Sequence, residues 1–212
     1  MTDSFFIGLD DLGGIAMRRD DSEMLVVQEE SNFVVVADLN GRSERFRRPL
    51  SAMNNYGTIP HHFPDPPDNN GLEGITVNTS NDPVVLVKEC HPGLLIELDS
   101  SLTTILSARM LHANQGFIHP KLKAEKLNFS GLSYDSSSDT LWIVSDKGEC
   151  LFQYDWTRDT VLQRLDLTIN TGDKPKRIRK PEGVAFDPDR KKLYVVSDRD
   201  ANLYLFKLHD DS

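Results

Sequence analysis

The sequence has few cysteines and no long apolar run. Cys90 and Cys150 are its only cysteines, and they form no CxxC pair, so neither a disulfide framework nor a cysteine-based zinc site is indicated. No apolar stretch reaches the length of a signal-peptide core or a membrane span, which predicts a chain that is soluble as written. Helical periodicity is also missing, and its absence excludes a helical solenoid.

The common catalytic signatures are missing as well. No GxSxG, Walker A, GxGxxG or HExxH pattern occurs in the context that its chemistry requires. The net charge of -9, from 33 acidic and 24 basic residues, argues against a nucleic-acid surface. An acidic chain instead favours cationic partners, metal ions included.

A unit that begins with a glycine and reaches an acidic residue fifteen positions later occurs four times. The copies read GGIAMRRDDSEMLVVQE, EGITVNTSNDPVVLVKE, SGLSYDSSSDTLWIVSD and EGVAFDPDRKKLYVVSD. Their glycines are Gly14, Gly74, Gly131 and Gly183, and their acids are Glu29, Glu89, Asp146 and Asp198. A repeat of this size determines the architecture on which every other motif lies.

Short β-rich runs inside each unit flank a polar centre with turn chemistry, which predicts a hairpin. A third run follows in every copy, and a fourth, near residues 45–50, 103–106 and 161–167, in the first three. Four antiparallel strands per repeat predict an all-β fold, a β-propeller of four-stranded blades with four blades visible. The expected blades are residues 12–59, 71–117, 128–170 and 180–208, and residues 1–11, through Ser4 to Leu9, are expected to supply a closing strand.

The sequences of the second to fourth copies resemble those of a known family. NNGLEGITVN with VVLVKECHPGLLIELD, then FSGLSYDSSSDTLWIVSD and KPEGVAFDPDRKKLYVVSD, are similar to the SdiA-regulated, or YjiK/CarP-like, β-propeller family from about Leu9 to Phe206. The resemblance implies a propeller of the bacterial periplasm or membrane-associated envelope, linked in some members to calcium homeostasis. Family members generally carry one more N-terminal blade and a signal or anchor, which implies that this chain is truncated.

Six acids are predicted to surround one mouth of the propeller. Because two hairpin strands run out and back, a glycine and the acid fifteen residues later share a face, together with the residue before the glycine. Like charges held close need a cation, a proton or a base, and oxygen ligands suit Ca²⁺. The sequence therefore predicts a noncatalytic propeller that binds Ca²⁺ or a small ligand through Glu29, Glu73, Glu89, Asp146, Glu182 and Asp198.

Three alternatives remain at this stage. The acids can instead have a structural role in each blade, by accepting backbone N–H bonds or by pairing with Lys88, Lys147 and Arg199. A Ca²⁺-dependent hydrolase of the phytase or lactonase type would place the ion in the same mouth. A protein-interaction scaffold would instead use the loops, namely the proline-rich segment Ile59 to Asn70, with its metal-binding residue types, and the basic run Lys174 to Lys180.

Overall fold

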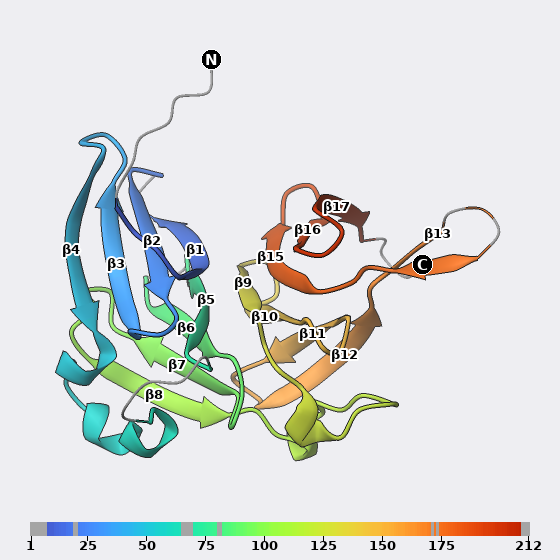
Figure 1. The fold of residues 1–212 in the computed structure, drawn as a ribbon, viewed down its shortest axis with the longest axis horizontal. Coiled ribbons are helices and arrows are strands. Elements are labelled where there is room, and N and C mark those ends of the chain that lie inside the picture. Colours follow the sequence, from blue (N-terminus) through green and yellow to red (C-terminus); the bar gives the residue numbers. More distant parts are fainter. Residues whose placement is uncertain are drawn as a thin grey trace.

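The fold is a four-bladed, all-β propeller (Figure 1). The structure, a computed structural model, describes residues 8–18, 21–64, 70–79, 82–170, 172 and 174–208. The first three blades are four-stranded antiparallel sheets, and their strands are β1 (Leu12–Arg18), β2 (Glu23–Gln28), β3 (Phe33–Asp38), β4 (Ser43–Pro49), β5 (Leu72–Val77), β6 (Val84–Lys88), β7 (Leu94–Leu98), β8 (Ile105–Met110), β9 (Gly131–Asp135), β10 (Thr140–Ser145), β11 (Cys150–Asp155) and β12 (Thr160–Asp166). The all-β propeller expected from the repeat is therefore confirmed.

Blade 4 has three strands among the described residues. They are β15 (Pro181–Asp187), β16 (Lys192–Ser197) and β17 (Asn202–Lys207). The expected closing strand, Ser4 to Leu9, falls mainly on residues 1–7, which lie outside the described residues. Five single-turn 3-10 helices lie in the described connections: η1 (Leu50–Ala52), η2 (Tyr56–Thr58), η3 (Pro60–His62), η4 (Ala113–Gln115) and η5 (Ala124–Lys126).

Two details of the sequence reading need correction. The fourth strand of blade 2 does not cover residues 103–106; β8 begins at Ile105 and continues to Met110, because Asp99 binds the backbone N–H groups of Thr103 and Thr104 in a turn. The basic run Lys174 to Lys180 is not entirely a loop either. Its residues Pro175–Arg177 form β14, which pairs with β13 (Thr168–Asn170) in a small hairpin ahead of blade 4.

The first hairpin of each blade turns at the polar centre that the repeat predicts. Asp21, Asp82, Asp139 and Lys191 lie there, and all four have left-handed backbone conformations with φ between 49° and 68°. Aspartate tolerates this conformation better than most residues, whereas a lysine is unusual in it. The same turn geometry therefore recurs in every copy even where its sequence does not.

Neighbouring blades pack face to face through aliphatic and aromatic side chains. The core between blades 1 and 2 includes Leu25, Val36 and Leu86, and the core between blades 2 and 3 includes Val87, Phe129 and Phe152. A third cluster joins blade 3 to blade 4. Because the middle strands of blades 1 to 3 bury apolar side chains on both faces, β2, β3, β6, β7 and β10 are almost continuously apolar rather than alternating.

The repeated glycines allow the innermost strands to lie against one another. A Cβ atom placed on Gly14 would come within 2.7 Å of the Cα of Gly74, and one on Gly74 within 2.9 Å of the Cα of Gly131. Any larger residue would therefore separate adjacent blades, which explains why glycine opens each unit. The series ends at Gly183, whose nearest described neighbour would be Val196 of its own blade.

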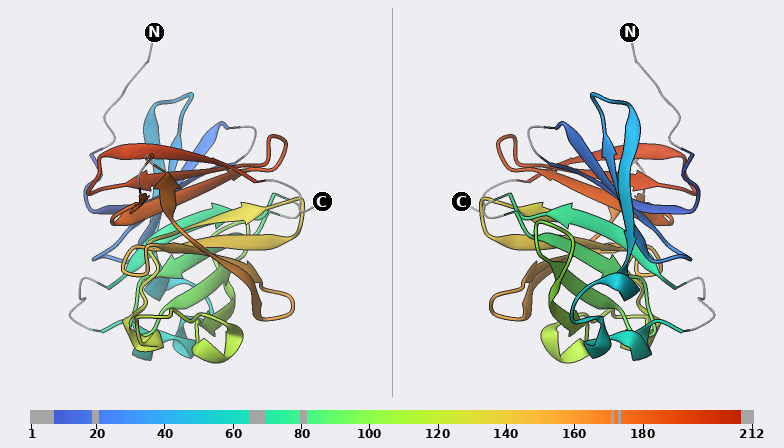
Figure 2. Two further views of the ribbon diagram at one scale, coloured as in Figure 1. Left: turned by 90° about the vertical axis from the view of Figure 1, so that its right-hand side faces the viewer. Right: turned by 90° about the vertical axis from the view of Figure 1, so that its left-hand side faces the viewer.

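Blade 4 is not joined to blade 1 as the other neighbours are joined. Strand β1 packs along β5, β5 along β9 and β9 along β15, but no packing of similar extent links β15 to β1 in the described ranges. The two blades stand apart in Figure 1, and the side views in Figure 2 show the sheets stacked around the centre. No helix in the described part of the chain is long and apolar enough to cross a membrane.

Candidate functional site

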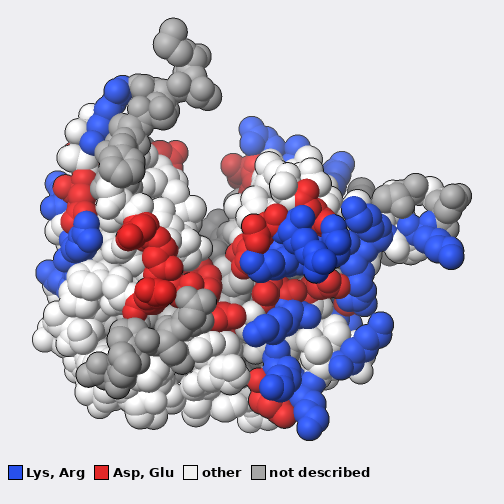
Figure 3. All heavy atoms as spheres, viewed as in Figure 1, with Lys and Arg blue, Asp and Glu red and all other residues white. Residues whose placement is uncertain are grey.

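The six predicted acids line a single cavity of about 430 Å³ at one mouth of the propeller. Acidic side chains gather at the centre of this face, and basic ones lie mainly over blades 3 and 4 (Figure 3). The other polar residues of the cavity wall are Asn128, Ser130 and Lys180. The prediction that these acids share one mouth agrees with their positions in the structure.

Strand register explains why each glycine and its acid reach the same end of a hairpin. The four glycines pair directly with Val27, Val87, Val144 and Val196, each of which precedes its acid by two residues. The chain leaves the sheet at this point, so the acid lies at the rim. The interval of fifteen residues is thus the span of one hairpin plus the residue that follows its second strand at the rim.

Three carboxylates from blades 1 and 2 converge on one point. Glu29, Glu73 and Glu89 each offer an oxygen, and these oxygens all lie within 4.8 Å of one another. All three side chains are half-buried. Two oxygens bound to the same Ca²⁺ at about 2.4 Å lie at most about 4.8 Å apart, so the three carboxylates fit a shared hard cation.

Burial, together with electrostatic repulsion within this group, favours a bound proton. Burial, followed by the negative charges of Glu29 and Glu89, raises the pKa of Glu73 to about 9. Burial and the charge of Asp11 raise the pKa of Glu29 as well, and a hydrogen bond from Glu73 opposes that rise. Oxygen Oε1 of Glu29 is buried and accepts no hydrogen bond from the described residues. Without a cation, the group therefore keeps one carboxyl neutral near pH 7.

The opposite side of the cavity is already neutralised by a lysine. The Lys180 Nζ donates a 2.7 Å hydrogen bond to Asp198 and lies 3.3 Å from Glu182. These contacts raise the pKa of Lys180 above its ordinary range. The expected acidic pair of blade 4 is thus present, but its cation is supplied by the protein. Among the described residues, no ion pair is found for the other four acids of the cavity, which are Glu29, Glu73 and Glu89 of blades 1 and 2 and Asp146 of blade 3.

Part of the structural hypothesis also agrees with the contacts. Asn128 donates a 2.7 Å hydrogen bond to Glu89, and Asp146 accepts one from the backbone N–H of Lys147. Burial raises the pKa of Asp146 nonetheless. The lysine expected beside Glu89 is not its partner, because Lys88 is fully buried and its ammonium donates to the carbonyl of Cys90. The carboxylates of Glu89 and Asp146 therefore accept N–H hydrogen bonds, whereas no such bond to the carboxylate of Glu29 or Glu73 is found among the described residues.

Sequence reasoning missed Asn128 and Lys180 as members of the cavity. Both lie three residues before the glycine of their repeat, as do Asp11 and Gly71. In three blades the carbonyl at this position accepts the backbone N–H of the repeat acid: Asp11 from Glu29, Gly71 from Glu89 and Lys180 from Asp198. Alignment of the copies back to this position would have found both residues.

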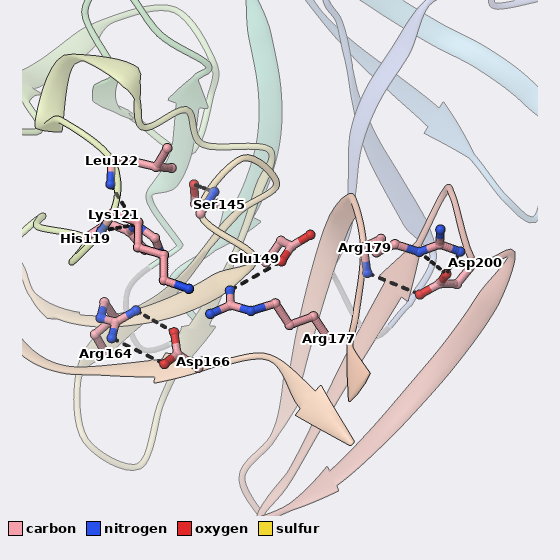
Figure 4. A network of polar contacts seen from close by, with 11 residues as sticks. His119, Lys121, Leu122, Ser145, Glu149, Arg164, Asp166, Arg177, Arg179 and Asp200 are labelled. Carbon is pink, nitrogen blue, oxygen red and sulfur yellow. Dashed lines mark hydrogen bonds and ion pairs between the residues drawn. The ribbon is translucent and has the colours of Figure 1, made fainter. Parts of the chain in front are cut away.

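The lesser candidates have other contacts. The ring centroids of His61 and His62 lie 3.8 Å apart and the rings are tilted by 49°, while Asp65 and Asp68, the acids of the same proline-rich segment, lie outside the described residues. Within the basic run, Arg177 pairs with Glu149 and Arg179 with Asp200 (Figure 4). Much of the charge of this run is therefore used in pairs within the protein.

Comparison with known proteins identifies the family. A family model described as SdiA-regulated matches residues 59–207, more than half of the chain. The chain belongs to the SdiA-regulated family. This agrees with the resemblance of the repeats, and no curated protein gives a significant sequence match.

Solved structures similar to this SdiA-regulated chain confirm the fold only. A protein of unknown function from Bacteroides caccae has a TM-score of 0.57 and 10% identity over 95% of this chain and 58% of its own. The Cps50 (Swd1) β-propeller domain of Myceliophteria thermophila has a TM-score of 0.56 and 12% identity, over 94% of this chain and 53% of its own. A chain of a mitotic checkpoint complex has a TM-score of 0.55 and 11% identity, over 94% of this chain and 49% of its own. The chain thus spans about half the length of the structures it matches.

Proposed function

We propose that this protein is a noncatalytic β-propeller that binds Ca²⁺ through Glu29, Glu73 and Glu89. The observation that carries the proposal is the convergence of these three carboxylates, within 4.8 Å, on the side of the cavity that has no described lysine or arginine partner. Six carboxylate oxygens are enough for a cation that takes six to eight oxygen ligands, and water in the cavity can complete the shell.

The chemistry of the ligands favours Ca²⁺ over other common ions. The group contains only carboxylates, whereas zinc and copper prefer nitrogen and sulfur. Mg²⁺ requires a near-octahedral shell at shorter distances, which three half-buried glutamates from separate strands provide less readily. Glu29 begins the β2–β3 turn, Glu89 follows β6 and Glu73 lies in β5, so the group combines rigid and more adaptable positions. Flexible oxygen coordination of this kind suits Ca²⁺.

Isothermal titration with Ca²⁺ at pH 8 tests the proposal. We expect binding with a dissociation constant of about 10⁻⁴ to 10⁻³ M, the range of weak calcium modules. Glu73→Gln and Glu89→Gln should each weaken binding at least about tenfold, because each removes a charged ligand. Glu125→Gln is the matched control, since Glu125 is exposed and lies outside this cavity. Absence of heat and of a thermal shift in millimolar Ca²⁺ would reject the metal site.

A second arm separates binding from catalysis. A hydrolase that used the same ion would turn over phytate or lactones in the presence of Ca²⁺, and Glu73→Gln would abolish that activity. Lys180 is a rim cation that could contact an anionic substrate, but it is paired with Asp198 and Glu182. We therefore favour binding, and turnover of either substrate class would contradict it.

A role at the bacterial envelope, linked to calcium homeostasis, is the broader part of the proposal. Its support is the family resemblance together with an acidic cavity whose ligands suit calcium. Fractionation of cells that produce the native gene product tests the location. Recovery in the cytoplasmic fraction alone would contradict an envelope role without affecting the metal site.

A further inference from the structure

The connection between blades 2 and 3 holds a histidine with one unused hydrogen-bond donor. The Nδ1 of His119 accepts the backbone N–H groups of Lys121 and Leu122, each at 3.1 Å, so the ring proton of the neutral imidazole is on Nε2. That Nε2 is buried, and no hydrogen-bond partner for it is found among the described residues. A buried N–H without an acceptor is destabilising, so this donor marks a place for an oxygen atom that the described chain does not supply.

Three basic side chains act on this imidazole from separate segments. Lys121 belongs to the same connection, Arg164 to β12 and Arg177 to the end of β14 (Figure 4). Burial, followed by the positive charge of Arg164, lowers the pKa of His119. The charges of Arg177 and Lys121 act in the same direction, and the charge of Asp166 opposes them. These three cations and the imidazole are called here the His119 cluster: His119, Lys121, Arg164 and Arg177.

Backbone hydrogen bonds hold the segments of the cluster together. The N–H of Ile178 donates to the carbonyl of Leu167 at 2.9 Å, and the N–H of Leu167 donates to the carbonyl of Glu149 at 3.0 Å. Leu167 and Ile178 are buried in the core that joins blades 3 and 4. The fold itself therefore fixes the backbone at the neighbouring positions, which are those of Asp166 and Arg177.

The cluster keeps a positive charge after its own ion pairs are counted. Asp166 accepts two N–H groups of Arg164, at 2.6 and 3.4 Å, and Glu149 accepts one of Arg177, at 3.3 Å. For the ammonium of Lys121, the described part of the chain provides neither an ion pair nor a hydrogen bond. Three cations therefore face two carboxylates. A guanidinium has more N–H groups than the single one that Glu149 accepts, so Arg177 keeps donors for a further acceptor.

We propose that the His119 cluster binds a phosphate group. One phosphate oxygen accepts the Nε2–H of His119, and others accept N–H groups of Arg177 and Lys121, which balances the excess positive charge. The side chains of Arg164 and Arg177 are 24% and 38% exposed, so a ligand reaches them from solvent. Because Nε2 is buried, the phosphate has to displace atoms beside the ring, and the exposed Lys121 is the member of the cluster that is able to move.

The arrangement of the donors favours phosphate over a further carboxylate. Asp166 and Glu149 already provide a carboxylate to each arginine. The remaining donors come from the blade 2 to blade 3 connection and from β14, so they approach from different directions. The oxygens of a tetrahedral phosphate point in several directions, whereas those of a carboxylate lie in one plane. A neutral imidazole N–H also adds a donor without adding repulsion between cations.

NMR titration of the unmodified chain with inorganic phosphate at pH 7 tests the site. EDTA is present and the ionic strength is constant, so the result does not depend on the calcium site. We expect the ring Nε2–H signal of His119 to shift with a dissociation constant of about 10⁻³ M. The pKa of His119 should rise, because a bound anion favours the charged imidazole. Chloride at the same ionic strength should have neither effect. A His119 signal that phosphate does not change would overturn the proposal.

Three variants separate the cluster from a general effect of charge. His119→Asn keeps an oxygen that can accept the N–H groups of the connection but removes the Nε2–H, and Arg177→Lys keeps the charge but removes the planar guanidinium. Each should weaken phosphate binding at least about tenfold. Lys123→Gln is the matched control, because Lys123 is an exposed lysine of the same connection, and it should change the affinity less than about twofold. Equal weakening by all three variants would contradict the site.

Vesicles distinguish two sources of the phosphate group. Inorganic phosphate and the phosphomonoester of phosphatidic acid offer the same oxygens to the cluster. Cosedimentation with phosphatidylcholine vesicles that contain phosphatidic acid, lost in His119→Asn and in Arg177→Lys, would support the site and identify a lipid headgroup. A His119 shift in inorganic phosphate without cosedimentation would support the site and identify free phosphate.

Discussion

Replacing Glu73 by glutamine should stabilise the protein progressively as the pH rises. The pKa of Glu73 is about 9 in the fold against 4.5 in the unfolded chain. Between these values the folded chain holds a proton that the unfolded chain has lost, so each rise in pH favours unfolding. The stability that comes from this proton is complete below pH 4.5 and is lost as the pH rises through 9.

The size of the effect follows from the same two values. About 3.5 pH units separate the ordinary pKa from pH 8, and each unit costs about 1.4 kcal/mol, which gives an upper limit near 5 kcal/mol. The carboxyl lines an open cavity and is only half-buried, so solvent screens it and a value of about 2 kcal/mol is more realistic. Glutamine keeps the shape of the neutral carboxyl but has no proton to lose.

Urea unfolding in EDTA at several values between pH 5 and pH 9 measures this difference. The advantage of Glu73→Gln should be near zero at pH 5 and about 2 kcal/mol at pH 8, a shift of about 4 to 8 °C in Tm. Glu125→Gln, an exposed acid outside the cavity, should show no such trend. A difference between Glu73→Gln and the unmodified chain that does not change with pH would refute the argument that burial and the neighbouring acids raise the pKa of Glu73.

Three further predictions address the packing and the cavity. Gly74→Ala should lower the free energy of unfolding, measured with urea, by about 1–3 kcal/mol, because its Cβ would lie 2.9 Å from the Cα of Gly131. Gly57→Ala, with no atom within 4 Å of the new Cβ, should lower it by less than about 0.5 kcal/mol. Equal losses would contradict the role of close strand contact. Leu151→Ala should lower the free energy of unfolding by about 2–4 kcal/mol, because Leu151 is buried. Leu203→Ala, measured on dilute protein, should lower it by less than about 0.5 kcal/mol, because Leu203 is exposed. A large loss at Leu203 would show that this face of blade 4 is covered. Lys180→Met should raise the calcium affinity measured by titration about two- to fivefold, because it removes a positive charge from the cavity wall. Lys207→Met, outside the cavity, should leave the affinity unchanged. Weaker binding by Lys180→Met would show that Lys180 organises the site.

The sequence was sufficient to predict the repeat geometry. Glycine at a fixed interval from an acid, with turn residues at the centre, specifies one hairpin and the side of the ring that both ends reach. The fifteen-residue interval of the repeat is therefore enough to locate Glu29, Glu89, Asp146 and Asp198 at one rim. Glu73 and Glu182 followed because they precede their glycines by one residue.

Side-chain partners were less predictable than positions. Lys88 is adjacent to Glu89 in sequence, but strand alternation sends its side chain into the protein, where the ammonium contacts the carbonyl of Cys90. Lys180 is eighteen residues from Asp198, yet the pairing of β15 with β16 brings them together. Adjacency in sequence therefore suggested the wrong lysine, because neighbours along a strand point to opposite faces.

The repeat also explains why the four copies are not electrostatically equivalent. Each blade contributes an acid at the same position, but a base or amide three residues before the glycine is present only in blades 3 and 4, as Asn128 and Lys180. In blades 1 and 2 this position is occupied by Asp11 and Gly71, which add a negative charge or no side chain at all. A structural duty common to all blades would need the same partner in each. The differences at this one position instead concentrate uncompensated charge on Glu29 and Glu73, where a proton or a cation must balance it.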